Sequence, residues 1–592
     1  MREIFASRLA TTTILSGVLA AVLALPAHAA DVTKQRLENA DAEPQNWITT
    51  FQNYSSHRYS RLSEINQNNV KNLKVAFTVP LTTALLGRPN VQLENAPMVD
   101  DGFMYFDDAG GVFYKIDVRP GNRFVPVWRT DVSLSKDEQA RTRGQAMWGN
   151  SVYLGMTDGR VVAVDRTSGD IKFDLQIARV PHPKGSNINV EKEGMTQAPL
   201  AVEGKILVAN AKGDSGTIGW LEAIDAVTGK EIWRTYTVPR PGEPGNETWK
   251  DDHNAWKTGG ASLWTTGSYD VAQRVIIEGT AQPVPMFDPE FRPGDNLYSN
   301  SAVAFDIDTG KIKWFFQYTP NESWDYDAQG VHMLIDADFK GQAGKKMVLH
   351  FDRNGFAYQL DRTNGQFLNA VQFNEKVTWT AGIDPKTGKP LEYDPGKALQ
   401  TYIPATRWAR ADTVAKTACP PLEGGLRWQP PAYNPVKRLA YSGGEDGCNT
   451  RQIVPSVTLA NGGIDEKGRS KPGTATHAGT LHGLLTILDV TTGTLKARLP
   501  LPHSNRSGML ATAGGLVFTA NIDGSITAHN DETLAEMWRF ETGTAIKAPP
   551  MAYSIGTKQF IAVMVGAPGA GGDDWPELKD QLPAAMLYVF SL

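Results

Sequence analysis

Two acidic residues separated by one position carry the most suggestive chemistry in this chain. They are Asp325 and Asp327, in the segment Trp324-Asp325-Tyr326-Asp327. In an extended segment, side chains two positions apart point to the same side, so both carboxylates can face one site. Carboxylate oxygens are ligands for hard metal ions, and an ionised carboxylate can act as a general base. The alternative is that each Asp merely closes a turn.

A sequence motif that repeats along the chain indicates the elements that must position these residues. An apolar run ends in Asp or Asn, a Gly usually follows within a few residues, and a Trp or Phe often comes next. The repeated positions are Asp117, Asp165, Asp225, Asp306, Asp361, Asp489 and Asn530. Each copy predicts two strands joined by a tight turn in which Gly allows a positive φ angle. The repeat unit is therefore β structure.

The spacing of the copies predicts an all-β fold, an eight-bladed β-propeller. Copies recur near the ~40–50 residues of a four-stranded blade, with longer gaps where loops are inserted. The stretch 428–441 fills the long gap before Asp489 as a degenerate copy. A blade shared between an N-terminal strand, around 73–78, and the C-terminal strands completes the ring. The repeated aromatics are expected to pack between adjacent sheets. Several small independent β domains are the alternative, but no Pro/Ser-rich linker separates the copies.

Composition fits one large body. The chain has 592 residues, 41% hydrophobic and 21% charged, which supports a substantial core. The net charge is -5, so the chain lacks the excess of positive charge that is typical of nucleic-acid-binding proteins. Residues 1–29 read as a signal peptide, because an apolar run after Arg8 ends at the cleavage-like Pro26-Ala27-His28-Ala29. We therefore expect a single domain over residues 30–592, in the periplasm and without a membrane span. An uncleaved anchor is the alternative.

Two cysteines, Cys419 and Cys448, are the complete set in this sequence. In an oxidising compartment an even pair predicts a disulfide. Closing a loop of about 30 residues stabilises a fold by roughly 3–4 kcal/mol in the chain-entropy model. The sequence has no Cys-x-x-Cys-His, so this chain carries no c-type haem.

A run of four motifs resembles one family of enzymes. The motifs are Gly294-Asp-Asn-Leu-Tyr-Ser-Asn-Ser, Lys313-Trp314, Trp324-Asp325-Tyr326-Asp327 and Asp352-Arg353-Asn354-Gly355. In this order and spacing the run resembles the pyrroloquinoline quinone (PQQ)-dependent alcohol dehydrogenases, the methanol dehydrogenase-like quinoproteins, without a haem domain. The resemblance begins near Asn46 and continues into the C-terminal strands. It implies an eight-bladed propeller with the cofactor at one end of the central channel.

PQQ is a planar o-quinone with three carboxylates, so its pocket needs an apolar platform, cations and hydrogen-bond donors. The resemblance makes Trp264, which follows Gly259-Gly260, the platform under the rings; core packing is its alternative role. It implies that Arg143 pairs with a cofactor carboxylate and that Arg353 stabilises negative charge on the quinone oxygens. The further cofactor contacts that it implies are Glu94, Thr196 and Trp428, and Arg427, which departs from the family, is expected to place an additional cation near the cofactor.

The resemblance also assigns the base and the metal ligands. Asp325 matches the family's general base, which takes the hydroxyl proton while the carbon-bound hydrogen passes as hydride to the quinone. The metal ion polarises the quinone carbonyl. The metal is Ca²⁺ or a lanthanide, because hard oxygen ligands suit either ion; Asp327 resembles the lanthanide-dependent branch, and its extra negative charge favours a trivalent ion. The implied ligands are Asp214, Gln282, Asp325 and Asp327, in which Asp214 replaces the family Glu and Gln282 the family Asn.

Two departures from the family bear on the substrate. Many members have adjacent cysteines at the place of Asp137-Glu138, and many have Asn-Trp at the place of Arg427-Trp428. Losing methanol-enzyme features argues for a larger alcohol, such as a sugar, a polyol or a bulky secondary alcohol, selected by the long loop 378–420. A cyclic toxin alcohol such as a trichothecene is a further alternative.

The missing haem motif and the resemblance together imply a partner. Electrons must leave through another molecule, and a soluble periplasmic cytochrome c is the expected acceptor. The competing class is a non-enzymatic propeller scaffold of an outer-membrane assembly type. A scaffold has no reason to keep a Trp platform together with the acidic pair and Arg353.

Overall fold

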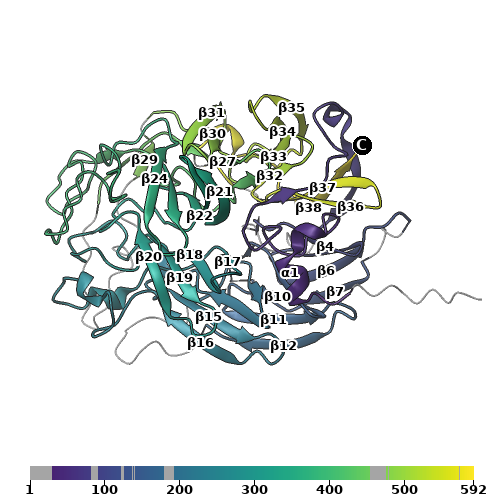
Figure 1. Cartoon of the computed structure of the whole chain (residues 1–592), viewed down its shortest axis with the longest axis horizontal. Helices are drawn as coiled ribbons and strands as arrows, with labels where there is room; N and C mark the ends of the chain where they lie inside the picture. The colour runs from purple at the N-terminus through teal and green to yellow at the C-terminus, as the bar shows by residue number, and fades with distance from the viewer. Residues whose placement is uncertain are drawn as a thin grey trace, which may run out of the picture.

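Small antiparallel sheets form a ring in the computed structural model. The structure describes residues 30–81, 91–121, 126–136, 138, 140–178, 193–453, 475–477, 479–567, 569–572 and 574–592. The expected signal peptide, residues 1–29, lies outside the described residues. In Figure 1 the strand labels run round the ring from β4 to β38, which returns beside the first.

The ring has eight blades, which are numbered here in chain order. Blades 1 and 2 are β4 (Met98–Asp100), β5 (Phe103–Asp107), β6 (Val112–Asp117), β7 (Trp128–Asp131), and β9 (Ala146–Trp148), β10 (Ser151–Gly155), β11 (Arg160–Asp165), β12 (Ile171–Gln176). Blades 3 and 4 are β13 (Leu200–Val202), β14 (Lys205–Ala209), β15 (Trp220–Asp225), β16 (Glu231–Tyr236), and β17 (Ser268–Asp270), β18 (Val275–Gly279), β19 (Ser301–Asp306), β20 (Ile312–Gln317).

Blades 5 and 6 are β21 (Met333–Phe339), β22 (Gln342–Phe351), β23 (Phe356–Asp361), β24 (Phe367–Gln372), and β26 (Ala432–Asn434), β27 (Leu439–Asp446), β30 (His482–Asp489), β31 (Thr494–Leu501). Blade 7 is β32 (Met509–Thr512), β33 (Leu516–Ala520), β34 (Ser525–Asn530) and β35 (Glu536–Glu541), with β1 (Tyr59–Ser60) added in parallel. Blade 8 is β36 (Met551–Ile555), β37 (Lys558–Val565), β38 (Met586–Ser591) and β2 (Lys74–Pro80).

Blades 6 and 8 confirm the two less regular parts of the prediction. The degenerate copy at 428–441 supplies β26 and β27 of blade 6. In blade 8, β2 pairs antiparallel with β38, with Lys74 opposite Ser591, so the two ends of the chain close the ring. An eight-bladed propeller is therefore the fold of this chain.

The recurring Asp-Gly turn packs against a tryptophan of the preceding blade in blades 2, 4 and 5. In blade 4, Asp306 Oδ1 accepts a hydrogen bond from the Thr309 amide (3.0 Å), and the Gly310 amide donates to the Asp306 carbonyl (2.8 Å). Gly310 has φ = 69°, and a Cβ there would lie 2.4 Å from the Trp233 ring of blade 3. Trp233 in turn donates its indole N–H to the Ile307 carbonyl (2.9 Å). The predicted packing of aromatics between adjacent sheets is confirmed.

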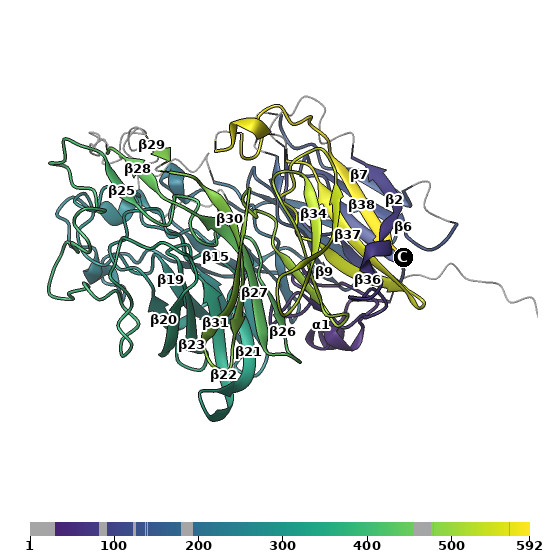
Figure 2. The ribbon, with the colours of Figure 1, turned by 90° about the horizontal axis from the view of Figure 1, so that it is seen from above.

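Antiparallel strand order brings two sets of loops to one end of the ring. The loops that lead into the first strand of a blade lie beside the loops that join its second and third strands. Outside the blades lie β3 (Gln92–Leu93) with β8 (Arg141–Thr142), and β25 (Lys416–Ala418) with β28 (Asn449–Arg451) and β29 (Ala475–His477). Figure 2 shows the second group beyond one end of the blades. The predicted disulfide between Cys419 and Cys448 is present and joins the end of β25 to the start of β28.

Helices are a minor part of the described structure. The α-helix α1 (Lys34–Glu38) begins after Thr33, whose hydroxyl accepts a hydrogen bond from the Arg36 amide. Within the described residues, no helix is long and apolar enough to cross a membrane.

Candidate active site

All the site residues expected from the sequence come from the two sets of loops at one end of the ring. Loops that lead into first strands carry Glu94, Arg143, Thr196, Trp264, Asp325, Asp327, Arg427 and Trp428. Loops that join second and third strands carry Asp214, Gln282 and Arg353. Residues from blades 1 to 6 can thus face the central axis from the same end of the propeller.

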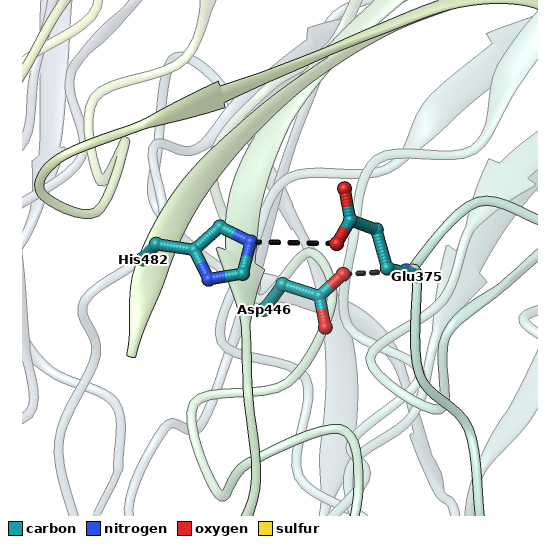
Figure 3. A group of neighbouring side chains, drawn as sticks. All are labelled: Glu375, Asp446 and His482. Atoms are coloured by element: carbon teal, nitrogen blue, oxygen red, sulfur yellow. Dashed lines mark hydrogen bonds and ion pairs between the residues drawn. The ribbon is translucent and has the colours of Figure 1, made fainter. Parts of the chain in front are cut away.

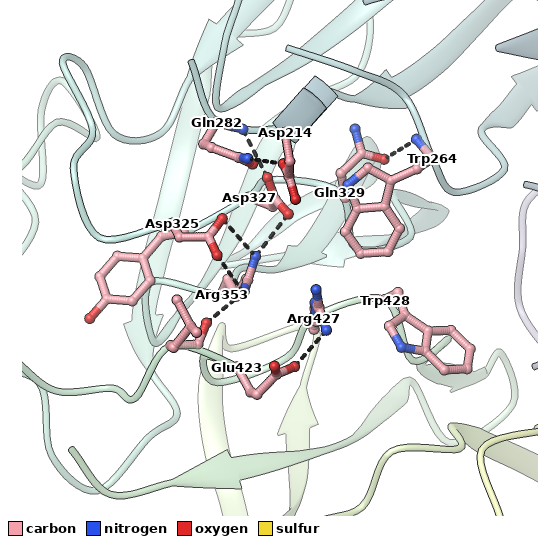
Figure 4. Close-up of polar contacts among 12 residues, drawn as sticks. Asp214, Trp264, Gln282, Asp325, Asp327, Gln329, Arg353, Glu423, Arg427 and Trp428 are labelled. Carbon is pink, nitrogen blue, oxygen red and sulfur yellow. Dashed lines mark hydrogen bonds and ion pairs between the residues drawn. The ribbon is translucent and has the colours of Figure 1, made fainter. Parts of the chain in front are cut away.

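The Arg353 guanidinium lies between the two carboxylates of the acidic pair (Figure 4). Its Nη1 is 2.8 Å from Asp327 Oδ2 and its Nη2 is 3.3 Å from Asp325 Oδ2. The Gln282 amide N–H donates to Asp327 Oδ1 (2.8 Å), and Gln282 Nε2 donates to Asp214 Oδ1 (2.6 Å). The structure therefore brings all four expected metal ligands and Arg353 into one connected cluster.

Backbone conformation and buried hydrogen bonds set the direction of Asp325. Its φ is 68°, in the left-handed region that residues other than glycine seldom adopt. The buried Glu322 carboxylate accepts hydrogen bonds from the amides of Trp324 and Tyr326, the second at 2.9 Å. Asn300, from the Gly294–Ser301 motif, donates to the Tyr326 carbonyl (2.6 Å). These bonds hold the backbone on both sides of Asp325 and so set the direction in which its side chain leaves the backbone.

The long loop 378–420 packs beneath this segment. Trp324 lies against Trp379, with ring centroids 5.5 Å apart, and both rings are buried. The Tyr326 hydroxyl donates to the Pro420 carbonyl (2.7 Å). The loop that we expected to select the substrate therefore contributes aromatic side chains to a core that supports the acidic pair.

Two consecutive glycines join the Asp214 turn to the Gln282 segment. Asp214 lies in the short 3₁₀ helix η4 (Gly213–Ser215), and the Gly260 amide donates to the Thr217 carbonyl that follows it (3.0 Å). A Cβ on Gly259 would lie 2.2 Å from the Thr217 carbonyl oxygen, and one on Gly260 2.7 Å from the Gln282 carbonyl oxygen. Since only glycine fits such close backbone contacts, this pair sets the spacing of two expected metal ligands.

Trp264 follows the glycine pair, and the guanidinium groups of Arg143 and Arg427 lie near its ring; Figure 4 shows Arg427 and Trp264. Gln329 holds its backbone, because Gln329 Oε1 accepts the Trp264 amide hydrogen (2.9 Å). The Arg143 guanidinium carbon lies 4.6 Å from the Trp264 ring centroid and 5.1 Å from that of Trp428. The Arg427 guanidinium carbon lies 5.6 Å from the Trp264 centroid. Two aromatic rings and two guanidinium groups thus lie together at this end of the propeller.

Charged groups converge behind Arg143. Its Nη2 is 2.8 Å from Glu94 Oε2, and its Nη1 donates to the Thr196 hydroxyl (2.5 Å). Lys547, in the loop leading into β36, has its Nζ 3.8 Å from Glu94 Oε1. Burial raises the pKa of Glu94, but Arg143 and the neighbouring cations outweigh it and hold that pKa below its usual range. Burial lowers the pKa of Lys547 to about 7, despite the nearby Glu94.

Burial makes the ionised form of the acidic cluster electrostatically costly, even with the Arg353 guanidinium between its carboxylates. Burial raises the pKa of Asp325 to about 6, although the Arg353 guanidinium opposes this and Asp214 adds to it. Burial also raises the pKa of Asp327 well above its usual range, again against Arg353. Gln282 Oε1 is buried without a hydrogen-bond partner. An unpaired amide oxygen beside three carboxylates is a donor set that suits a hard metal ion.

Several supporting residues were not anticipated from the sequence. They are Glu322, Gln329 and Lys547. Gln329 and Glu322 lie within a few positions of the acidic pair, which was the one signal available for them. Lys547 had no such signal, because it stands far from the family motifs in the sequence. It comes near Glu94 only because the ring closes.

The fold and the site define a β-propeller protein that gathers oxygen ligands, a guanidinium group and an aromatic platform at one end. Residues 47–381 match the PQQ family model, described as the glucose/ethanol/alcohol dehydrogenase β-propeller domain. The chain is 32% identical to the quinoprotein alcohol dehydrogenase PedH of Pseudomonas putida, over 98% of this chain and 96% of the relative. It is 30% identical to the quinoprotein ethanol dehydrogenase of Pseudomonas aeruginosa, over 95% and 93% respectively.

A solved structure agrees with these sequence matches. The structure titled europium-containing methanol dehydrogenase has a TM-score of 0.81 and 27% identity, covering 94% of this chain and 100% of that one. This protein belongs to the PQQ-dependent alcohol dehydrogenase family. The cofactors of the family are PQQ and one metal ion, calcium or a lanthanide.

The expected site residues fit both PQQ and a metal ion. Three carboxylates and the unpaired Gln282 oxygen match a hard cation. The Trp264 and Trp428 rings match a planar cofactor, and the cations of Arg143, Arg427 and Lys547 match its carboxylates.

Proposed function

We propose that this protein oxidises an alcohol to the corresponding carbonyl compound at the cluster of Asp325, Asp327 and Arg353. The observation that carries the proposal is the convergence of these groups, with Asp214 and Gln282, beside the Trp264 platform. Within this proposal Asp214, Gln282, Asp325 and Asp327 hold the metal ion. Glu94, Arg143, Thr196, Trp264, Arg353, Arg427 and Trp428 bind PQQ.

When bound, PQQ supplies an o-quinone that accepts hydride and the metal ion supplies Lewis acidity. Asp325 accepts the proton of the substrate hydroxyl, and its left-handed backbone aims the carboxylate toward the cluster. Arg353 keeps Asp325 ionised through its Nη2 and provides positive charge where negative charge develops. Glu322 and Asn300 act as positioning residues, because they bind the backbone on either side of Asp325.

The substrate that we propose is a sugar, a polyol or a bulky secondary alcohol. Arg427 and Glu423 support this, because they form a partly exposed ion pair (2.7 Å) near Trp264 that can bind further hydroxyl groups. Glu138 stands at the place of a cysteine in many relatives. It pairs with Lys212 (3.2 Å), and Lys212 lies two positions before Asp214. Asp137 lies outside the described residues.

We also propose that residues 30–592 form one domain, exported to the periplasm after removal of residues 1–29. The continuous ring of blades and the disulfide between Cys419 and Cys448 support this, since disulfides persist in oxidising compartments. A soluble cytochrome c is the proposed electron acceptor. Its support is the sequence, which has no haem attachment motif.

The decisive experiment is a dye-linked oxidation assay on apoprotein, with and without PQQ and with calcium or lanthanum. The substrate panel contains short alcohols, sugars, polyols and bulky secondary alcohols. Turnover is expected only with PQQ and one of the ions. Asp325→Asn is expected to lower kcat by roughly 10²–10⁴-fold while PQQ still binds, because a neutral amide cannot accept the proton.

The matched control is Asp338→Asn, which changes an exposed carboxylate in β21. Wild-type rates are expected for this variant. If Asp325→Asn turns over like the control with PQQ bound, the assignment of the base is wrong. If PQQ neither binds nor supports turnover with either ion, the enzymatic proposal fails and a scaffold role replaces it.

A further inference from the structure

A second group of metal-ligating side chains lies where blades 5 and 6 meet, and it shares no residue with the acidic cluster. It consists of Glu375, Asp446 and His482 (Figure 3). Each residue offers one ligand atom, and these atoms all lie within 4.8 Å of one another. The group contains one imidazole and two carboxylates, so it differs in chemistry from the all-oxygen cluster around Asp325.

Strand pairing places two of the three residues side by side. Asp446 ends β27 and His482 begins β30, and their Cα atoms are direct partners in the antiparallel ladder of blade 6. Directly paired residues of a sheet project from the same face, so strand pairing makes the His482 imidazole and the Asp446 carboxylate neighbours. In Figure 3 both side chains point toward Glu375.

Glu375 reaches the pair from the preceding blade, in the loop after β24. Its backbone amide donates to Asp446 Oδ2 (2.5 Å), which fixes the distance between the two blades at this point. Its neighbour Asn374 donates to the Glu445 carbonyl (2.8 Å), a second bond across the same boundary. The backbone on both sides is therefore held, and the exposed Glu375 side chain is free to rotate into place.

The distances suit a small divalent ion. His482 Nε2 lies 3.9 Å from Glu375 Oε2, which is too long for a hydrogen bond. Ligand atoms bound at about 2.0–2.1 Å in a tetrahedral zinc site lie roughly 3.4 Å from one another, so small rotations of the three side chains, whose ligand atoms already lie within 4.8 Å of one another, close the site. As a bare surface ion pair, the contact between His482 and Glu375 contributes almost nothing to stability.

We propose that Glu375, Asp446 and His482 bind a second metal ion, Zn²⁺ or a similar first-row divalent ion, which clamps blade 5 to blade 6. Imidazole with carboxylates is a ligand set for such ions, whereas Ca²⁺ and Mg²⁺ prefer oxygen alone. Three protein ligands leave the fourth position to water on the exposed side. The clamp lies two residues before Cys448, so metal and disulfide hold the same end of β27 and the β28 that follows it.

The test is a zinc titration of protein saturated with PQQ and with calcium or lanthanum, so that the central cluster is already filled. Calorimetry is expected to show one equivalent of Zn²⁺ bound by the wild type. His482→Gln is expected to weaken this binding by at least about tenfold. Zinc is also expected to raise the melting temperature of the wild type but not of His482→Gln, because a ligand of the native state stabilises it.

His503→Gln is the matched control. His503 also has two carboxylate neighbours, but Asp523 faces its Nδ1 (3.4 Å) and Glu577 its Nε2 (3.0 Å), so their oxygens cannot converge on one ion. Zinc binding equal to the wild type is expected for this variant. Copper electron paramagnetic resonance gives a second readout, with hyperfine coupling to one imidazole nitrogen that His482→Gln abolishes. Equal zinc binding by wild type and His482→Gln, or a loss in His503→Gln alone, would overturn the proposal.

Discussion

Asp325 combines an uncommon backbone angle with an uncommon environment. A φ of 68° is tolerated by Asp and Asn better than by most residues, since their short polar side chains make local hydrogen bonds. Glu322 and Asn300 stabilise that conformation from either side. Asn is therefore the substitution that removes the charge of Asp325 while keeping its backbone, which makes Asp325→Asn a test of chemistry and not of folding.

Another buried carboxylate, Glu278 in β18, has no cation among its described contacts. It is 2% exposed, and burial raises its pKa to about 8, partly offset by the Gly267 amide. The folded state thus keeps a proton that the unfolded chain loses near its ordinary pKa. Between those two pKa values the folded state binds more protons, so stability falls as pH rises.

Glu278→Gln is expected to remove this loss of stability. Gln keeps the shape of the side chain and is neutral at every pH. The variant should equal the wild type near pH 4 and exceed it at pH 8, by on the order of 4 kcal/mol at most. Denaturant unfolding of both proteins across pH 4–9 measures the difference, and a difference that does not grow with pH would show that Glu278 is not neutral in the fold.

At the scale of elements, the turn of one blade holds the tryptophan of the blade before it. Gly310 meets two separate demands, a positive φ of 69° and a Cβ position only 2.4 Å from the Trp233 ring. The first demand makes any side chain strained, and the second leaves no space for one. The same pairing recurs at Gly365 with Trp314 and at Gly169 with Trp128.

Gly310→Ala is therefore expected to cost more than an ordinary glycine substitution. Gly341, in the hairpin between β21 and β22, is the control because its φ is 82° and a Cβ there meets no atom within 4 Å. Gly341→Ala should lose about 1 kcal/mol from backbone strain alone. Gly310→Ala should lose about 1–3 kcal/mol more from displacement of Trp233. Equal unfolding free energies for the two variants would contradict the packing role of the turn.

At the scale of the whole molecule, closure of blade 8 ties the two ends of the chain together. The β2 strand pairs with β38, and Trp538 of blade 7 donates to the Leu73 carbonyl just before β2 (3.1 Å). Phe590 of β38 is fully buried against Trp538, with ring centroids 5.3 Å apart. Every blade of the described ring thus has a neighbour on each side.

Phe590→Ala is expected to destabilise the entire ring. The loss of a buried aromatic ring costs about 3–5 kcal/mol. If the ring unfolds as one unit, hydrogen exchange should speed up equally in β19, on the far side, and in β37. Val436→Ala, at an exposed position, is the control and should leave both strands unchanged. Faster exchange confined to blade 8 would show that the blade opens on its own.

Sequence alone determined the architecture and the family. The repeat of an apolar run, an Asp and a Gly predicts blades because strand, turn and docking aromatic are encoded locally. The motifs around Asp325 and Arg353 predict a PQQ enzyme because their spacing is that of the family. The disulfide was predicted from an even pair of cysteines in a chain that we expect to be exported.

Tertiary structure decided what holds those residues in place. Lys547 reaches Glu94 only because the ring closes, and the two are far apart in the sequence. The loop 378–420 was expected to select the substrate, and the structure shows that its Trp379 is buried against Trp324. Asp446 and His482 meet because β27 and β30 pair across a long insertion. Contacts of this kind depend on strand register and on the packing of one blade against the next, which local sequence patterns do not specify.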